Sequence, residues 1–236
     1  MDERVAEVLK WLERRGSRRN VQGMARYGIR SERRVFGVSM GTMLPLAKRL
    51  GKDHQLATAL WQSACYEAQM LATMLDEPGR VTRRQMNAWA ADFDNWAVCD
   101  TACFKLFDQT PFAWEKARQW AVSPREFVKR AGFALMACLA LHDKAAPDRN
   151  FLPFLPLVEK GARDDRNFVK KAVSWALRGI GERSLALNAA AVATAKRLAE
   201  SEQASCRWVG KDALRQLASP AVRARLARRV STSRRR

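Results

Sequence analysis

The sequence contains only two histidines in 236 residues, His54 and His142. A Ser-His-Asp triad or a histidine-rich metal centre is therefore hard to build, and we expect both histidines in surface or capping positions. The cysteines number five, lie in apolar stretches and form no Cys-x-x-Cys motif. Cys99 and Cys103 are four residues apart, but no further cysteine or histidine lies near them in the sequence. We expect reduced core thiols and neither a metal nor a cofactor.

Signals of β-structure and of membrane insertion are also scarce. The sequence has no alternating run of β-branched residues and no Asn-Gly or Asp-Gly turn. The longest apolar run, residues 131–141, is about half the length of a membrane span. The chain begins Met1-Asp2-Glu3, with no early apolar segment after a basic start, so no secretory signal is expected. We expect a cytoplasmic protein that associates with the nucleoid and makes no contact with a membrane.

Acidic residues are few compared with basic ones. The chain has 24 Asp and Glu against 43 Lys and Arg, a net charge of +19. Such an excess predicts a polyanionic partner, and nucleic acid is favoured over a membrane surface. Residues 119–236 carry +14 of this charge and residues 1–118 carry +5. The C-terminal half is therefore the stronger candidate for an electrostatic contact surface.

Apolar residues recur three and four positions apart along most of the chain, which predicts an all-α protein. One long helix is expected from Asp53, as its N-cap, to about Leu75. Ser123, Pro124 and Glu126 have the order of a capping box that starts another helix. Further helix starts are expected at Thr82, at Asp164-Asp165 and at Ser219-Pro220.

A repeat of 41 residues relates three segments of the second half. They begin at Arg125, Arg166 and Arg207, and each has a lysine four positions later. Helix pairs with a period near 40 residues are typical of HEAT repeats, so we predict a HEAT-like solenoid over residues 1–230, followed by a basic disordered tail at 231–236. Equivalent positions of stacked repeats face the same way, which predicts a basic ladder on a concave surface that follows a phosphate backbone. A solvated helix face is the alternative for any single rung.

Residues 85–104 differ from the rest of the chain because they contain no lysine or arginine. This segment holds several aromatic residues and three aspartates, of which Asp92 and Asp94 are expected to serve as cap or turn residues. If Asp94 or Asn95 caps the following helix, Trp96 and Asp100 lie on one helical face. A carboxylate beside an indole attracts a cation. The alternative is a core tryptophan and a salt bridge between helices.

A basic surface with a cation-attracting centre fits DNA that carries a positively charged lesion. In N3- or N7-alkylated purines the cationic ring weakens the glycosidic bond, and loss of the base leaves positive charge on the sugar. A carboxylate can stabilise that charge and orient the attacking water without a metal or a cofactor. The sequence thus points to a glycosylase reaction on alkylated DNA.

Three segments strengthen this interpretation: residues 95–101 (NWAVCDT), 127–131 (FVKRA) and 168–178 (FVKKAVSWALR) resemble motifs of AlkD-type DNA alkylation repair glycosylases. The stretch 66–72 is also similar, and the resemblance covers most of residues 20–220. It implies a HEAT-like fold that removes 3-methyladenine and 7-methylguanine from duplex DNA in base excision repair, without flipping the base into a closed pocket. It further implies aromatic contacts from Trp96 and Trp175, catalysis by Asp100 and a phosphate anchor at Arg130. The chain departs from the family pattern at Asn95 and Ala97, which bears on substrate range.

Phosphate binding is assigned to basic residues of the repeats and their surroundings, and the choice between Lys129 and Arg130 as anchor stays open. The candidates are Lys129, Arg130, Arg166, Lys170, Lys171, Arg178 and Lys211. The predicted partner is double-stranded DNA containing alkylated bases, bound by a monomer. Two other functions fit the same charge pattern: a non-catalytic HEAT scaffold that binds nucleic acid, and an adaptor that binds an acidic protein.

Overall fold

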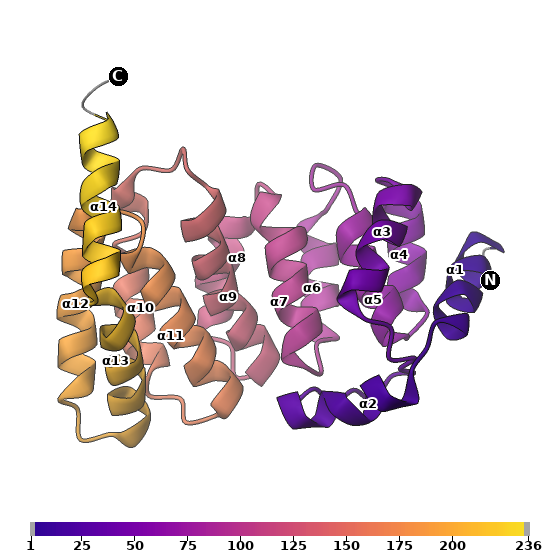
Figure 1. Ribbon diagram of the computed structural model, residues 1–236, viewed down its shortest axis with the longest axis horizontal. Coiled ribbons are helices and arrows are strands. Elements are labelled where there is room, and N and C mark those ends of the chain that lie inside the picture. Colours follow the sequence, from indigo (N-terminus) through magenta and orange to yellow (C-terminus); the bar gives the residue numbers. More distant parts are fainter. Residues whose placement is uncertain (1–2, 234–236) are drawn as a thin grey trace. The chain divides into compact units, whose positions relative to one another are not determined.

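The computed structural model describes residues 3–233 and confirms the all-α prediction (Figure 1). Within these residues there is no β-strand, and one isolated bridge joins Arg34 to Cys65. The α-helices are α1 (Glu3–Arg14), α2 (Arg18–Met24), α3 (Met40–Leu50), α4 (His54–Gln62), α5 (Tyr66–Leu75), α6 (Arg83–Ala91), α7 (Trp96–Lys105), α8 (Ala113–Ala121), α9 (Glu126–His142), α10 (Phe154–Gly161), α11 (Asn167–Gly181), α12 (Leu185–Ala199), α13 (Ala204–Leu217) and α14 (Pro220–Ser233). Short 3-10 helices are η1 (Ala25–Tyr27), η2 (Phe107–Gln109) and η3 (Asp148–Asn150).

The chain divides into two compact units. Unit 1 ends at Phe112 and contains α1 to α7, whereas unit 2 begins at Ala113 and contains α8 to α14. Both units have an apolar core, and all five cysteines are buried free thiols, as the sequence predicts. The single domain over residues 1–230 stays a prediction.

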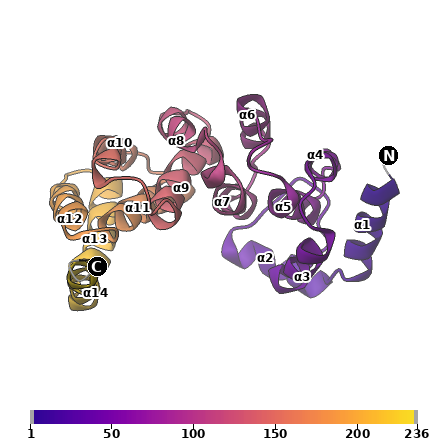
Figure 2. The ribbon, with the colours of Figure 1, turned by 90° about the horizontal axis from the view of Figure 1, so that it is seen from above.

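Unit 2 is built from helix pairs in two layers. Helices α8, α10 and α12 form one layer and α9, α11 and α13 the other, each helix packed on its sequence partner and on its neighbours in the same layer (Figure 2). Most of α9 is buried, from Arg130 to Ala140, because this helix contacts both α8 and α11. The layered pairs place the beginnings of α9, α11 and α13, which carry the 41-residue repeat, at corresponding positions.

The predicted long helix from Asp53 to Leu75 is wrong, because the chain breaks between α4 and α5. Asp53 caps α4 as expected, accepting a hydrogen bond from the Leu56 amide at 2.9 Å. The helix ends at Gln62, and Ala64 has a left-handed φ of 52°. Apolar spacing continues across this break, so periodicity alone could not reveal a single residue in the left-handed region.

The predicted helix starts have mixed outcomes. Thr82 caps α6 and Pro220 begins α14, as expected. The capping box at Ser123 is wrong: α9 begins only at Glu126, and its N-cap, Arg125, makes no side-chain cap bond. The hydroxyl of Ser123 instead accepts from the Arg125 amide at 3.2 Å within the preceding turn. Helix α11 likewise begins at Asn167, two residues after the predicted start at Asp164-Asp165.

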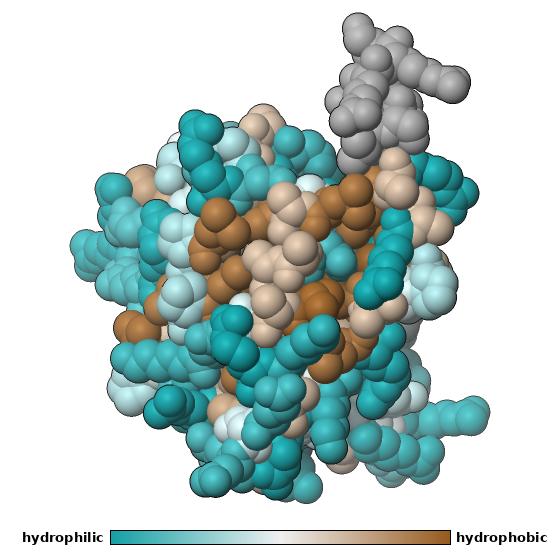
Figure 3. All heavy atoms as spheres, turned by 90° about the vertical axis from the view of Figure 1, so that its left-hand side faces the viewer, coloured by the Kyte–Doolittle hydropathy of each residue, from teal (hydrophilic) through white to brown (hydrophobic). Residues whose placement is uncertain are grey.

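The C-terminal helices of unit 2, α12 to α14, leave an apolar surface exposed. Figure 3 shows apolar side chains gathered in the middle of the surface where α12 to α14 lie, and Leu185 at the start of α12 is 43% exposed. Helix α14 packs on α12 and α13 but leaves part of this face open. Of the predicted basic tail at 231–236, Ser231 to Ser233 belong to α14, and residues 234–236 lie outside the described residues.

Candidate nucleic-acid interface

The start of α7 is fixed by two polar side chains of unit 1. Asn95 is 1% exposed and caps the helix, since its side-chain oxygen accepts from the amides of Ala97 and Val98 at 3.0 and 3.1 Å. Asp94 accepts from the Ser31 hydroxyl at 2.8 Å and pairs with Arg33 at 3.0 Å. These bonds tie the first turn of α7 to the segment before α3. Asn95, where the chain departs from the family pattern, thus has a defined structural task.

Trp96 and Asp100 lie one turn apart in α7, and both side chains are partly exposed. The Trp96 indole donates its N–H to the backbone carbonyl of Tyr27 at 3.0 Å, and Tyr27 is itself 74% exposed. Trp96 is therefore not a core aromatic residue. The structure holds an indole and a carboxylate at neighbouring surface positions of one helix, an arrangement suited to contact with a cationic group.

The other residues of the acidic, aromatic segment are structural. Trp89 and Phe93 are buried, and Trp89 stacks on Trp61 with ring centroids 4.0 Å apart. Asp92 is the C-cap of α6 and accepts from the Trp61 indole at 2.8 Å. Asp92 and Asp94 thus have the cap and turn roles expected of them. Within this segment Trp96 and Asp100 combine partial exposure with positions one helical turn apart on α7.

In unit 2 one carboxylate binds basic residues at the beginnings of the first two repeat segments. Asp164 accepts from the Lys129 ammonium at 2.8 Å and from the Arg166 guanidinium at 2.6 and 2.9 Å. Hydrogen bonding to Arg166, supported by Lys129, holds the pKa of Asp164 well below its ordinary value. Both cations are partly exposed, so Asp164 positions them at the beginnings of α9 and α11 while it neutralises one charge.

The next rung contains an aromatic residue that the sequence analysis did not single out. Lys170 lies over the ring of Trp208, 5.4 Å from its centroid, and Trp208 is 37% exposed. Lys171 and Lys211 are exposed on α11 and α13. Trp208 could have been noticed because it follows Arg207, the first residue of the third and weakest repeat segment. This patch offers cations and a stacking surface together.

Two residues predicted to contact phosphate, Arg130 and Arg178, form hydrogen bonds to other residues of unit 2. Arg130 is 7% exposed and donates to the Phe168 carbonyl at 2.6 Å, so it joins α9 to α11. Arg178 donates to the Gln216 side chain at 2.8 Å and lies 3.8 Å from Asp212, which joins α11 to α13. Lys129 is the more accessible of the two alternative anchors.

Trp175 lies in α11 of unit 2 and lines a pocket of about 290 Å³. Arginines dominate the polar wall of this pocket, and the one carboxylate, Glu182, binds Arg225 of α14 and Gln216 of α13. The remaining cationic lining residues are Lys144, Arg178 and Arg183. Trp175 therefore lies in a pocket whose charged residues are mostly basic. Trp96, in contrast, belongs to unit 1.

Comparison with known proteins places these observations in a family. The model of the DNA alkylation repair enzyme family matches residues 8–217. The chain belongs to the DNA alkylation repair enzyme family. The match spans both units and includes every residue assigned to DNA binding or catalysis from the sequence. The family resemblance expected from the motifs is thereby confirmed.

One solved structure supports the fold, and a second is reported only for its likeness. One is a member of "a new family of proteins related to the HEAT-like repeat DNA glycosylases with affinity for branched DNA structures"; the TM-score is 0.74 at 21% identity, over 90% of this chain and 95% of that chain. This likeness confirms the HEAT-like repeat fold. An engineered protein gives a TM-score of 0.37 at 14% identity, over 75% of this chain and 43% of that chain. No curated protein matches the chain in sequence.

Residues 3–233 contain no cluster of three or more His, Cys, Asp or Glu side chains that could hold a metal ion. His54, one of the two histidines, begins α4 and bonds through Nδ1 to the buried carboxylate of Asp76 at 2.7 Å. In the same part of the chain no helix is long and apolar enough to cross a membrane.

Proposed function

We propose that this protein removes 3-methyladenine and 7-methylguanine from duplex DNA by hydrolysing the N-glycosidic bond. The observation that supports this best is the surface pair of Trp96 and Asp100 on α7, in a chain of the DNA alkylation repair enzyme family. Alkylation at N3 or N7 gives the purine ring a positive charge, to which an indole face and a carboxylate are both attracted. DNA repair is the function of the family, and this lesion class is our proposal for the chain.

In the proposed reaction the bond between C1′ of the deoxyribose and N9 of the purine breaks, and its electron pair leaves with the base. The cationic base departs neutral, and positive charge develops on the sugar. Asp100 stabilises that charge and accepts the proton of the water that adds to C1′. We assign to Trp96 of unit 1 a contact with the lesion nucleotide, and the same assignment for Trp175 of unit 2 rests on its motif alone.

We assign DNA affinity chiefly to the basic residues of unit 2. Lys170, Lys171 and Lys211 are at least partly exposed and can reach phosphates directly. Lys129 and Arg166 are available once their bonds to Asp164 rearrange. Arg130 and Arg178 support this surface by joining α9, α11 and α13. We propose that the monomer binds duplex DNA in this way, in the cytoplasm and at the nucleoid.

The decisive experiment is release of free methylated base from alkylated duplex DNA. Wild-type protein is expected to release 7-methylguanine in a single-turnover reaction, whereas Asp100→Asn is expected to bind the DNA and release little. An adaptor for an acidic protein predicts neither binding nor release. Wild-type protein that binds alkylated duplex DNA tightly and releases no base would contradict the glycosylase proposal.

A second candidate is a non-catalytic protein that binds branched DNA. It is favoured by the fold shared with the solved structure whose family is described as having affinity for branched DNA structures. The exposed Trp208 beside Lys170 also suits unpaired bases as well as phosphates. This candidate predicts tighter binding to a four-way junction than to a duplex of equal length, with no base release from either.

A further inference from the structure

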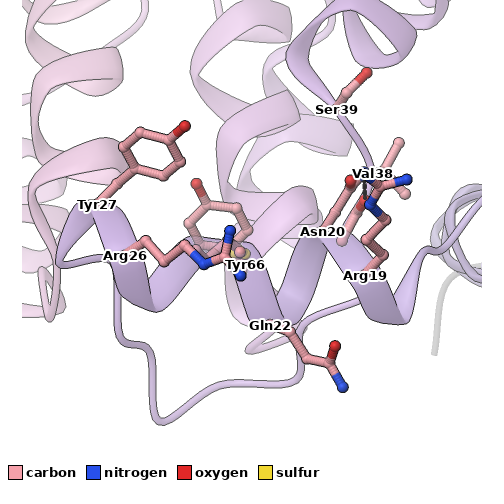
Figure 4. Close-up of a pocket in the computed structure, with 11 residues that line it drawn as sticks. Arg19, Asn20, Gln22, Arg26, Tyr27, Val38, Ser39 and Tyr66 are labelled. Atoms are coloured by element: carbon pink, nitrogen blue, oxygen red, sulfur yellow. Dashed lines mark hydrogen bonds between the residues drawn. The ribbon is translucent and has the colours of Figure 1, made fainter.

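Unit 1 contains an open pocket of about 520 Å³ beside α2, within the roughly 300 to 1,000 Å³ range of small-molecule sites. Figure 4 shows Tyr66 of α5 between Tyr27 on one side and Asn20 with Val38 on the other. Arg19 and Arg26 contribute the charged groups, and no carboxylate lines the pocket. The lining therefore combines phenol rings, amide groups and cations.

The wall of this pocket is held in a fixed conformation by a buried carboxylate behind it. Glu67 is 0% exposed and accepts hydrogen bonds from the amides of Phe36, Gly37 and Val38, the Gly37 bond being 2.6 Å long. Gly37 has a φ of 80°, and its carbonyl accepts from the Asn20 side chain at 2.8 Å. A wall fixed on both sides makes a preformed pocket.

Gly23 lines the same pocket within α2, at a position where glycine disfavours the helix relative to alanine. A Cβ atom at Gly23 would meet no atom of the protein within 4 Å. Packing therefore does not require a glycine here, in contrast to Gly37, where a Cβ would lie 2.3 Å from the Ser17 carbonyl oxygen. The missing side chain leaves open space in the pocket that a bound molecule can use.

The pocket adjoins the proposed catalytic helix through Tyr27. The side chain of Tyr27 lines the pocket, and its carbonyl accepts the indole N–H of Trp96. Burial, with the nearby charges of Glu67 and Asp94, raises the pKa of the Tyr66 hydroxyl to about 12, and this phenol, like an ordinary tyrosine, can donate a hydrogen bond at physiological pH. A ligand in the pocket would lie next to the first turn of α7, where Trp96 precedes Asp100 by one helical turn.

We propose that this pocket holds one unstacked nucleotide of a DNA strand bound at the surface that Trp96 and Asp100 occupy. The base packs against the exposed ring of Tyr27, its polar edge meets Asn20 and Gln22, and its phosphate pairs with Arg19 or Arg26. This inference rests on the DNA binding of the proposed function but not on base release. It makes unpaired or displaced nucleotides, in addition to the lesion itself, part of what the protein recognises.

The test compares a fully paired duplex with the same duplex carrying one extra, unpaired nucleotide, using fluorescence anisotropy at fixed salt. Wild-type protein is expected to bind the bulged duplex about tenfold more tightly, in the range that stacking of one base on an aromatic side chain provides. Gly23→Leu fills the open space and is expected to remove this preference while the affinity for the paired duplex stays the same. Gly23→Ala, which favours α2, serves as a folding control.

The matched control is Gly79→Leu, because Gly79 also has open space around its Cβ position but lies in the exposed turn between α5 and α6. It is expected to keep the tenfold preference. A wild-type protein without the preference, a Gly23→Leu variant that retains it, or equal loss of affinity for both duplexes would overturn the inference. Saturable binding of deoxyadenosine monophosphate at micromolar concentration would also overturn it, since the ligand would then be a free nucleotide. Failure to bind either duplex would instead contradict the proposed function.

Discussion

At the scale of single residues, the important distinction is between the aspartates that bond to neighbouring segments and the one to which we assign the proposed chemistry. The Asp92 carboxylate accepts a hydrogen bond from Trp61. The Asp94 carboxylate accepts one from Ser31 and forms an ion pair with Arg33. Asp100 lies one turn after Trp96 at a partly exposed position. Three aspartates within nine residues of sequence thus have different roles, because Asp92 ends α6, Asp94 lies between the two helices and Asp100 lies within α7.

We expect Asp100→Asn to lower single-turnover release of 7-methylguanine by about 10²- to 10³-fold, because the variant keeps the shape of the side chain but loses the charge that stabilises the sugar cation. DNA affinity and the melting temperature should change little. Asp165→Asn removes one exposed carboxylate of unit 2 and is the matched control for net charge. Asp100→Asn protein with near wild-type release would contradict the assignment. A large fall in melting temperature would indicate a structural salt bridge instead.

At the scale of helices, the repeat positions at the starts of α9, α11 and α13 differ in how they are engaged. Lys129 is bonded to Asp164, Lys170 lies over Trp208, and Lys211 is exposed. A repeat in sequence therefore predicts the common face but not the partners of each cation. Those partners depend on residues outside the repeated positions.

We expect Lys170→Ala and Lys211→Ala each to weaken binding to any duplex sequence and to reduce the salt slope by about one unit, because each removes one phosphate contact. Lys129→Ala should have a smaller effect, since its ammonium must first leave Asp164. The test is the dissociation constant measured at several salt concentrations between roughly 50 and 200 mM, a range over which phosphate contacts change DNA affinity strongly. Unchanged slopes in all three variants would exclude the basic ladder as a DNA-binding surface.

Asp164 joins two helices, so its titration should be visible in stability. Arg166 and Lys129 lower its pKa in the folded protein, and such a group stabilises the fold above its unfolded pKa, near 3.9, and loses this contribution as pH falls through the folded pKa. We expect Asp164→Asn to lower the unfolding free energy at pH 7 by about 2 kcal/mol. Urea unfolding from pH 7 down to pH 2, about two units below the unfolded pKa, should show less acid dependence in the variant. The variant should also bind DNA more tightly because two cations are released.

At the scale of the whole molecule, a charge of +19 is distributed over a chain that contains few groups for metal or nucleophilic catalysis. His54 forms a hydrogen bond with the buried carboxylate of Asp76, and the cysteines lie in the core. The reaction proposed for this protein therefore depends on electrostatic stabilisation within a basic, DNA-binding surface.

We expect EDTA to leave base release unchanged, because no metal-binding cluster exists among residues 3–233 and the proposed reaction has no step that uses one. The measurement is single-turnover release with and without chelator at constant ionic strength, since a change in salt would itself alter DNA affinity. Activity lost with EDTA and restored by zinc or magnesium would contradict a metal-independent reaction.

The all-α class, the HEAT-like period, the family and the helix that carries Trp96 and Asp100 follow from the amino-acid sequence alone. These properties depend on apolar spacing, capping residues such as Asn95 and motifs that are local in the chain. The break at Ala64, the burial of Arg130 against Phe168 and the pairing of Lys129 with Asp164 are visible only in the folded chain. The same is true of the pocket around Gly23. Each of these depends on contacts between residues distant in sequence or on one backbone angle, and neither is encoded in the spacing of residue types.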